Sequence, residues 1–403
     1  HEEEWLKGAW PTLSFLALKA SYSLTADRGP ASVTNSRVVI NATNPWRPNS
    51  GDAESALYVS DLENAALTYE KKHELNLGAA FGFFDNRINI EADWYKRNNY
   101  DLIGPVTTQG IGGQVVKFGN VASMQSSGVE LTLSTVNINR KNFKWTTDFI
   151  YSHAENKVTE LENQQRVIDL VAGTGFALEG YPVRSIFSIP FRGLNDEGIP
   201  TFLDQDGNVT STGIYFQERD NIDFLQYSGT ADPTDFGSFG NTFQWKGLKL
   251  NVFLTYSFGN VVRLDPVFRK SYSDLDAMPK EFRNRWVVPG DEKVTDIPVI
   301  SSRMQNHNNS ELSYAYNAYN YSSARIAKGD FIRLKEVSLS YDFPKKWVSA
   351  MKMNSLSLKV QGTNLALLYA DKKLNGQDPE FFNTGGVATP LPKQFTVTLR
   401  IGL

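Results

Sequence analysis

Hydrophobic and polar residues alternate one by one along several long stretches of this chain. Between residues 16 and 24 every second position is apolar, and polar residues such as Lys19 lie in between. The same pattern fills residues 73–83 and resumes in residues 88–94, after the short segment 84–87. Because successive side chains of a β-strand point to opposite faces, this period of two predicts strands, and the last two stretches predict a hairpin.

Further alternating stretches bring the expected number of strands to about ten. They cover residues 129–134, 145–151, 243–245, 248–257, 332–343, 356–361 and 395–403. Within the stretch 332–343 the alternation changes phase near Lys335 and Glu336, which predicts a β-bulge. Most stretches approach the roughly nine to eleven residues that a tilted membrane strand needs, whereas ordinary strands average about five or six. The lengths therefore favour membrane strands.

The connections between these stretches alternate between short and long. The short ones lie near residues 84–87, 137–142, 246–247 and 343–354, and the long ones near 25–66, 99–126, 155–235, 260–330 and 367–392. Outer-membrane barrels have short periplasmic turns and long extracellular loops. We therefore predict an all-β fold: an antiparallel transmembrane β-barrel with long extracellular loops. The segment Arg184–Leu194 is a candidate for an additional strand pair.

Aromatic residues gather at both ends of the predicted strands. Those beside the short turns are Phe83, Phe84, Phe143, Trp145, Phe243, Trp245, Phe343 and Trp347, and those at the opposite ends are Tyr22, Trp94, Tyr95, Tyr151, Tyr256 and Phe258. Amphipathic rings favour the two membrane–water interfaces, although aromatic residues are also common in strands generally. The polar residues of the pattern are expected to face the lumen, and include Lys19, Glu74, Asn76, Glu91, Asp93, Glu130, Lys144, Asp148, Lys249, Asn251, Arg333, Lys359 and Arg400.

Composition narrows the class of protein further. The 403 residues contain no run near the roughly 18 consecutive apolar residues of a membrane helix, and the mean hydropathy is −0.36. A net charge of −3 gives no reason to expect a nucleic-acid partner. Without cysteine, the chain has no disulfide and no thiolate metal site. The first residues, His1–Trp5, lack the basic and apolar regions of a signal peptide, so we expect a piece of a longer protein.

No catalytic constellation can be assembled from the sequence. Residues 204–208 begin like a calcium loop but lack its later carboxylates, and a turn is the simpler interpretation. Residues 110–113 are glycine-rich without the flanking strand and helix of a phosphate-binding loop. His73, His153 and His307 are isolated in sequence. We therefore predict no enzyme activity, no cofactor and no metal site.

Aromatic residues of the predicted loops are the candidate substrate contacts. They are Trp286, Tyr316, Tyr319, Phe381 and Phe382. Aromatic rings stack on the faces of sugars, so these side chains are candidates for binding glycans. Packing between long loops is the alternative interpretation of the same residues.

Several longer motifs resemble a known family. They include GDFIRLKEVSLSY (329–341), FPKK (343–346), QGTNL (361–365), GQDPE (376–380), PLPK (390–393), LKASYS (18–23), FDNRI (84–88), DWY (93–95), GNV (119–121), SGVE (127–130) and RW with PGD (285–291). Together they resemble the SusC/RagA-like branch of the TonB-dependent outer-membrane transporters. Two positions depart from the family pattern: the chain ends on Leu403 instead of an aromatic residue, and Ser323-Ala324 reverses the usual order.

The resemblance implies a fold, a function and partners. Such barrels have about 22 strands around a plug domain, so residues 1–403 would be the C-terminal part of the barrel, and the plug and TonB box are absent from this chain. The rest of the same transporter would pair with its edges. The implied function is TonB-dependent import of an oligosaccharide or peptide across the bacterial outer membrane, together with a SusD-like surface lipoprotein. The alternatives are a passive porin and a surface β protein that binds glycans.

Overall fold

The computed structural model describes residues 8, 10–29, 37–45, 55–110, 115–273, 275–276, 278–382 and 392–402. Some residues named above lie outside the described ones: His1–Trp5, 111–113, Pro390, Leu391 and Leu403. Within the described part, ten strands form one antiparallel sheet. They are β1 (Leu13–Asp27), β4 (Glu70–Phe83), β5 (Ile88–Thr107), β6 (Val116–Arg140), β7 (Phe143–Leu161), β13 (Asp235–Trp245), β14 (Leu248–Phe258), β17 (Phe331–Asp342), β18 (Ser355–Ala370) and β19 (Gln394–Gly402).

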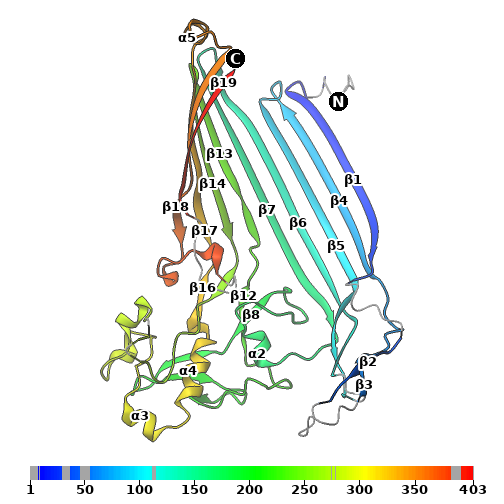
Figure 1. Ribbon diagram of the computed structural model, residues 1–403, viewed down its shortest axis with the longest axis vertical. Helices are drawn as coiled ribbons and strands as arrows, with labels where there is room; N and C mark the ends of the chain where they lie inside the picture. Colours follow the sequence, from blue (N-terminus) through cyan, green and yellow to red (C-terminus); the bar gives the residue numbers. More distant parts are fainter. Residues whose placement is uncertain are drawn as a thin grey trace.

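Each strand of this sheet pairs with the strands that precede and follow it in the order β1-β4-β5-β6-β7-β13-β14-β17-β18-β19. The sheet curves into an open wall whose edges are β1 and β19, and the start of β1 and the end of β19 lie at the end where the turns are short (Figure 1). The predicted antiparallel sheet of about ten strands is thus confirmed. Its connectivity is that of a barrel wall, in which every strand returns beside the previous one.

The short turns lie where the sequence predicted them. Phe84, Asp85 and Asn86 all have positive φ between β4 and β5, and the two-residue turn after β13 has φ of 47° at Lys246 and 89° at Gly247. Successive left-handed residues match the right-handed twist of the flanking strands. The connection from β17 to β18 is closed by the short helix α5 (Lys345–Ala350), which begins directly after a proline.

The predicted long loop at 99–126 is wrong. β5 continues to Thr107 and β6 begins at Val116, and the two strands stay paired as far as Thr107 and Val116. These extensions pass beyond the length that a bilayer requires, so neither face needs an apolar row there. Because the apolar alternation stops while the backbone ladder continues, the sequence pattern underestimates the length of the two strands.

The predicted bulge on β17 is confirmed at Lys335. On one side Leu334 and Glu336 pair with Leu254 and Phe253, and Lys335 has no partner in that ladder. The ladder with β18 also skips Lys335. One extra residue in one strand shifts the phase of the alternation, as the sequence showed.

The sheet is a single layer with two chemically different faces. One face carries exposed apolar side chains on the inner strands, among them Leu77 at 46% and Val360 at 44% exposure, which would be costly in water but suit lipid. The opposite face carries ion pairs, such as Lys19 with Glu91 at 2.5 Å. Tyr95 is a correction to the predicted aromatic belt: it lies on the polar face with Asp93, because adjacent residues of a strand point in opposite directions.

The apolar core of the chain lies outside the sheet. The two longest loops, residues 162–234 and 259–330, fold together below the wall (Figure 1). Their elements are α2 (Val167–Leu170), β8 (Ser185–Ser188), β9 (Phe191–Leu194), β10 (Pro200–Leu203), β11 (Val209–Thr210), β12 (Gln226–Thr230), β15 (Val261–Arg263), η2 (Lys280–Asn284), η3 (Asp291–Lys293), α3 (Arg303–Asn308), α4 (Leu312–Asn320), η4 (Ser323–Arg325) and β16 (Ile326–Lys328). We call this unit the loop module.

One buried cluster joins the two halves of the loop module. Leu170, Ile189 and Phe202 from the first loop pack with Leu312 and Tyr316 of α4 from the second. The candidate strand pair at Arg184–Leu194 belongs to this module: β8 pairs with β12 and β9 with β10, in small sheets separate from the wall.

The remaining loops are smaller. Residues 28–69 contain the hairpin β2 (Val39–Thr43) and β3 (Ala56–Asp61), and residues 371–393 contain η5 (Lys372–Leu374) and η6 (Pro379–Phe381). None of the helices in the described ranges has the length and apolarity to cross a bilayer.

Candidate functional site

A buried ion pair fastens the loop after β18 to the polar face of the wall. Arg333 of β17 lies opposite Thr255 in the sheet and is 4% exposed. Its Nη2 donates to both carboxylate oxygens of Asp378, at 2.5 and 2.6 Å, and lies 3.1 Å from Glu380. Asp378 also caps η6 by accepting from the amide of Glu380. Two motifs that are 45 residues apart in sequence therefore meet in one contact at the mouth of the barrel.

A second buried arginine joins the two halves of the loop module. The guanidinium of Arg263 donates to the carbonyl oxygens of Phe187 at 2.7 Å and Ser322 at 3.1 Å, and to Oγ of Ser188 at 2.9 Å. In the described part of the chain no carboxylate pairs with it. Burial lowers the pKa of Arg263 to about 9, so the group remains charged at neutral pH. Its positive charge is balanced by carbonyl and hydroxyl dipoles and by the Tyr321 ring, whose centre lies 5.9 Å from the guanidinium carbon.

Arg325 organises the second half of the module. Its Nη1 lies 2.7 Å from Glu281, its Nη2 donates to the carbonyl oxygen of Asp265, and its guanidinium lies 4.8 Å from the centre of the Phe268 ring. Arg325 is 3% exposed. Removing either partner of such a buried ion pair is strongly destabilising, because it leaves an uncompensated charge.

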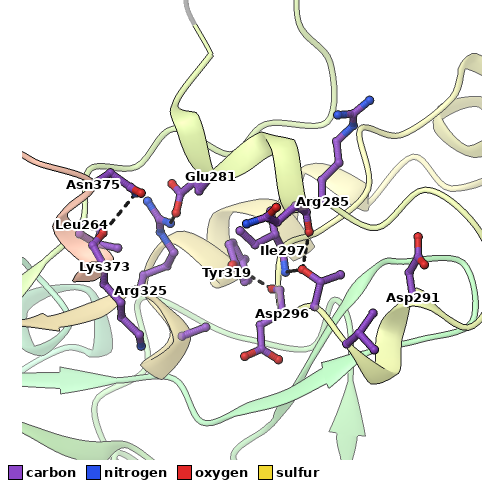
Figure 2. A pocket seen from close by; sticks show the side chains of 14 residues that line it. Leu264, Glu281, Arg285, Asp291, Asp296, Ile297, Tyr319, Arg325, Lys373 and Asn375 are labelled. Atoms are coloured by element: carbon purple, nitrogen blue, oxygen red, sulfur yellow. Dashed lines mark hydrogen bonds and ion pairs between the residues drawn. The ribbon is translucent and has the colours of Figure 1, made fainter. Parts of the chain in front are cut away.

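Beside this pair lies a cavity of about 560 Å³ between η2, η3 and the loop after β18. Figure 2 shows Glu281 and Arg325 joined at one end of it, the Tyr319 hydroxyl directed to Asp296, and Arg285 extending away from the cavity. Lys373 reaches in from the loop after β18 and donates to the carbonyl oxygen of Ile326 at 3.2 Å. Most of the charges around this cavity therefore already serve contacts within the chain.

The RW and PGD residues form one compact turn. The Trp286 indole is 7% exposed and donates to Glu292 at 3.0 Å, which lowers the pKa of that carboxyl. Asp291 accepts from the backbone amides of Val287 and Val288, and Gly290 has φ of 107°. Trp286 is thereby held as a structural side chain, and its ring lies against Gly198.

Two of the predicted substrate contacts also lie in the module core. Tyr316 and Tyr319 are 1% and 2% exposed, and their hydroxyls donate to the carbonyl oxygens of Val299 and Asp296. Burial raises the pKa of both, to about 12 for Tyr316, so both phenols remain neutral donors. With their rings covered on both sides, these residues fit the alternative role of packing between the loops.

Phe381 and Phe382 lie elsewhere, at the end of η6 and beside the wall. Phe382 is half-buried and lines a second cavity of about 610 Å³, at the extracellular end of β13, β14 and β17. Phe236 and Lys335 line the same cavity, and neither is among the residues predicted from the sequence as contacts. The phase change at Lys335 was the signal that could have pointed to this site.

The calcium-like segment is a turn. Asp204 accepts from the amides of Asp206 and Asn208, and Gly207 has φ of 80°. Across the described residues, no group of three or more His, Asp or Glu side chains is placed to hold a metal ion.

The curated proteins to which this chain is similar are TonB-dependent receptors. No family model matches the sequence. Curated relatives include the TonB-dependent receptors P3 and P39 of Formosa agariphila, which are 24% and 25% identical over 94% of this chain. The TonB-dependent receptor SusC of Bacteroides thetaiotaomicron is 22% identical over 84% of it. The chain spans only 37%, 38% and 32% of these three relatives.

The fold agrees with these relatives. The structure of the RagAB peptide transporter superposes with a TM-score of 0.76 at 24% identity, covering 97% of this chain and 41% of that one. The chain is SusC/RagA-like, in sequence and in fold. The SusC/RagA-like wall is therefore part of an outer-membrane β-barrel, with its exposed apolar face toward lipid and its ion-paired face toward the lumen. The family motifs now have physical roles, since GQDPE supplies Asp378 and RLKEVSLSY supplies Arg333 for the same contact.

Proposed function

We propose that the protein containing this chain imports a nutrient, an oligosaccharide or a peptide, across the outer membrane with energy from TonB. This chain supplies the C-terminal part of the barrel wall and the loop module at the mouth of the barrel. The observation that carries the proposal is the Arg333–Asp378 contact, which holds a loop against the lumen wall. Together with the large folded module, it favours a guarded mouth, whereas a passive porin keeps a water-filled channel.

A TonB-dependent uptake assay tests the proposal. The full-length gene is expressed in a strain that lacks its own copy, with and without a functional TonB system, and uptake of labelled oligosaccharides and peptides is measured. We expect uptake of one class that disappears when TonB is removed. Uptake that persists without TonB indicates a passive porin, and surface binding without uptake indicates a glycan-binding protein.

We further propose that a SusD-like surface lipoprotein covers the extracellular mouth. The loop module presents exposed apolar residues around the PGD turn, with Val287, Val288 and Val294 at 59%, 55% and 83% exposure. Such residues favour contact with another protein over contact with water. Affinity purification of the full-length transporter from mild detergent should recover a lipoprotein partner. Recovery of the transporter alone in several mild detergents would contradict this part of the proposal.

A further inference from the structure

The cavity at the barrel mouth differs in character from the one in Figure 2. Its lining includes Thr255 and Ser257 from the polar face of β14 and Glu380 from the loop after β18. The loop module contributes Asn260 to the same lining. The cavity therefore opens on the lumen side of the sheet, where β14, β17 and three loops converge.

The β-bulge directs an additional side chain into this cavity. Glu336 lies opposite Phe253 and accepts a hydrogen bond from Gln361 at 2.9 Å, so it faces the lumen. Lys335, the extra residue, lines the cavity as well. A bulge of this kind changes the direction of a side chain without ending the strand. Two consecutive residues of β17 thus face the lumen, where strict alternation would allow one.

Lys335 is the unmatched charge of the cavity. Arg184 is paired with Asp232 at 2.6 Å, and Glu380 lies 3.1 Å from Arg333. In the described part of the chain Lys335 makes neither an ion pair nor a side-chain hydrogen bond. The lining holds two cations and two carboxylates, so a negative group of a ligand would be attracted to the Lys335 ammonium group and not to the cavity as a whole.

The remaining wall is largely aromatic. Phe236 and Phe331 line it from the sheet, and Phe382 lines it from the loop while packing beside Leu374. Phenyl rings offer no hydrogen-bonding group, so three of them together suit an apolar side chain of a ligand.

We propose that this cavity binds the C-terminal end of a peptide, with the carboxylate on Lys335 and the apolar side chain of the last residue among the three phenyl rings. The inference rests on the proposed import function and names the substrate class for it. A peptide terminus combines the anion and the apolar side chain that the cavity accommodates. A uronate sugar supplies the anion and can stack on one phenyl face, but it has no apolar side chain to fill the space among the three rings.

Binding to the purified full-length transporter tests this assignment. The probes are the tripeptide Ala-Ala-Leu with a free C-terminal carboxylate, the same peptide as its amide, and digalacturonate, each titrated by calorimetry. The variants are Lys335→Met, which removes the charge and keeps an apolar stem, and Lys335→Arg, which keeps the charge. Lys249→Met is the matched control, because Lys249 is an exposed lysine of the same wall near the periplasmic turn.

We expect the wild type to bind the acid about tenfold more tightly than the amide, the size of one hydrogen bond to a charged group. Lys335→Met should abolish this preference, whereas Lys335→Arg and Lys249→Met should retain it. An unchanged preference in Lys335→Met overturns the inference, and tighter, Lys335-dependent binding of digalacturonate overturns the peptide assignment. Because binding is measured without TonB, these outcomes are separate from the uptake assay: TonB-dependent import with an unchanged Lys335→Met preference removes this site and leaves the proposed function standing.

Discussion

Arg333 and Asp378 form the contact on which the geometry of the barrel mouth depends. The two side chains are 4% and 5% exposed, and one guanidinium nitrogen reaches both carboxylate oxygens. Asp378 in turn caps η6, so the ion pair fixes both the place and the shape of the loop. This loop supplies Phe382 and Glu380 to the cavity at the mouth.

Asp378→Asn should release the loop from the wall. The substitution removes the buried carboxylate and leaves Arg333 only the more exposed Glu380, 3.1 Å away. The cost is therefore below the about 3–5 kcal/mol of a fully unpaired buried charge, and the loop can lower it by separating from the sheet. We expect faster hydrogen exchange in residues 371–382 of the full-length transporter, measured by mass spectrometry, while exchange in β17 changes little.

A pair on the same face of the wall provides the control. Lys19 and Glu91 are 58% and 47% exposed, and exposed pairs contribute only about 0–1 kcal/mol. Glu91→Gln should leave exchange in residues 371–382 unaltered. If Asp378→Asn also leaves that exchange unaltered, the ion pair does not hold the loop.

Arg263→Met should weaken the loop module without disturbing the wall. The substitution fits an apolar side chain into the buried site but removes the hydrogen bonds from the guanidinium to Phe187 and Ser188, while the carbonyl oxygen of Ser322 keeps the amide of Arg325 as a donor. Losing a hydrogen bond to a charged group costs about 1.5–3 kcal/mol. Arg263→Lys should give an intermediate loss, since an ammonium group cannot reproduce the planar set of donors.

Limited proteolysis in detergent measures this loss. We expect cleavage of Arg263→Met within residues 162–234 and 259–330 at protease concentrations that leave the wild type intact, while the folded wall survives. Equal resistance of the two proteins would show that the module is held together without Arg263.

The wall could be predicted from the sequence because lipid and water impose opposite requirements on its two faces. The alternation located the hairpin around residue 85 and the bulge at Lys335. Where β5 and β6 extend past the membrane, only backbone hydrogen bonds define the strand, and the pattern gave no sign of it. The alternation of apolar and polar residues therefore marks a strand only where the strand crosses the bilayer.

The loop module could not be predicted in this way. Its core combines side chains from segments more than 100 residues apart, such as Phe202 and Tyr316, and no local period connects them. The prediction of Tyr316 and Tyr319 as substrate contacts rests on the general use of aromatic loop residues in ligand binding. Their burial depends on β10 and η2 packing around α4, which is a property of the tertiary fold.

Asp169 should make the first turn of the module sensitive to acid. The side-chain hydrogen bond from Arg166 lowers the pKa of Asp169 below its ordinary value of 3.8, and Asp169 closes a capping box on α2. Because the folded state binds the proton more weakly than the unfolded state, this contribution to stability is present above about pH 4. It is lost as the pH falls through the lowered pKa of the folded state.

Hydrogen exchange of residues 167–171 at pH 6 and pH 3 measures this effect. We expect Asp169→Asn to raise exchange at pH 6, after correction for the intrinsic rate, and to have a smaller effect at pH 3, which lies below the ordinary pKa of 3.8. Asp206→Asn, in an exposed turn of the same module, should match the wild type at both pH values. A difference between Asp169→Asn and the wild type that is equally large at pH 3 would exclude the carboxylate as its cause.

Gly237→Ala should impair folding of the wall. The Tyr256 side chain crosses Gly237 to donate to the carbonyl oxygen of Ile150 at 2.9 Å, and a Cβ at residue 237 would collide with that carbonyl and with the phenol. Overfilling such a site costs about 1–3 kcal/mol. On the same strand, a Cβ at Gly240 would lie 3.3 Å from the ring of Phe253, which can move aside.

The fraction of full-length transporter that keeps its folded mobility in unheated detergent gels should therefore fall for Gly237→Ala and stay near the wild type for Gly240→Ala. Equal losses in the two variants would mean that replacing either glycine of β13 is harmful, and that the path of Tyr256 across Gly237 has no special role.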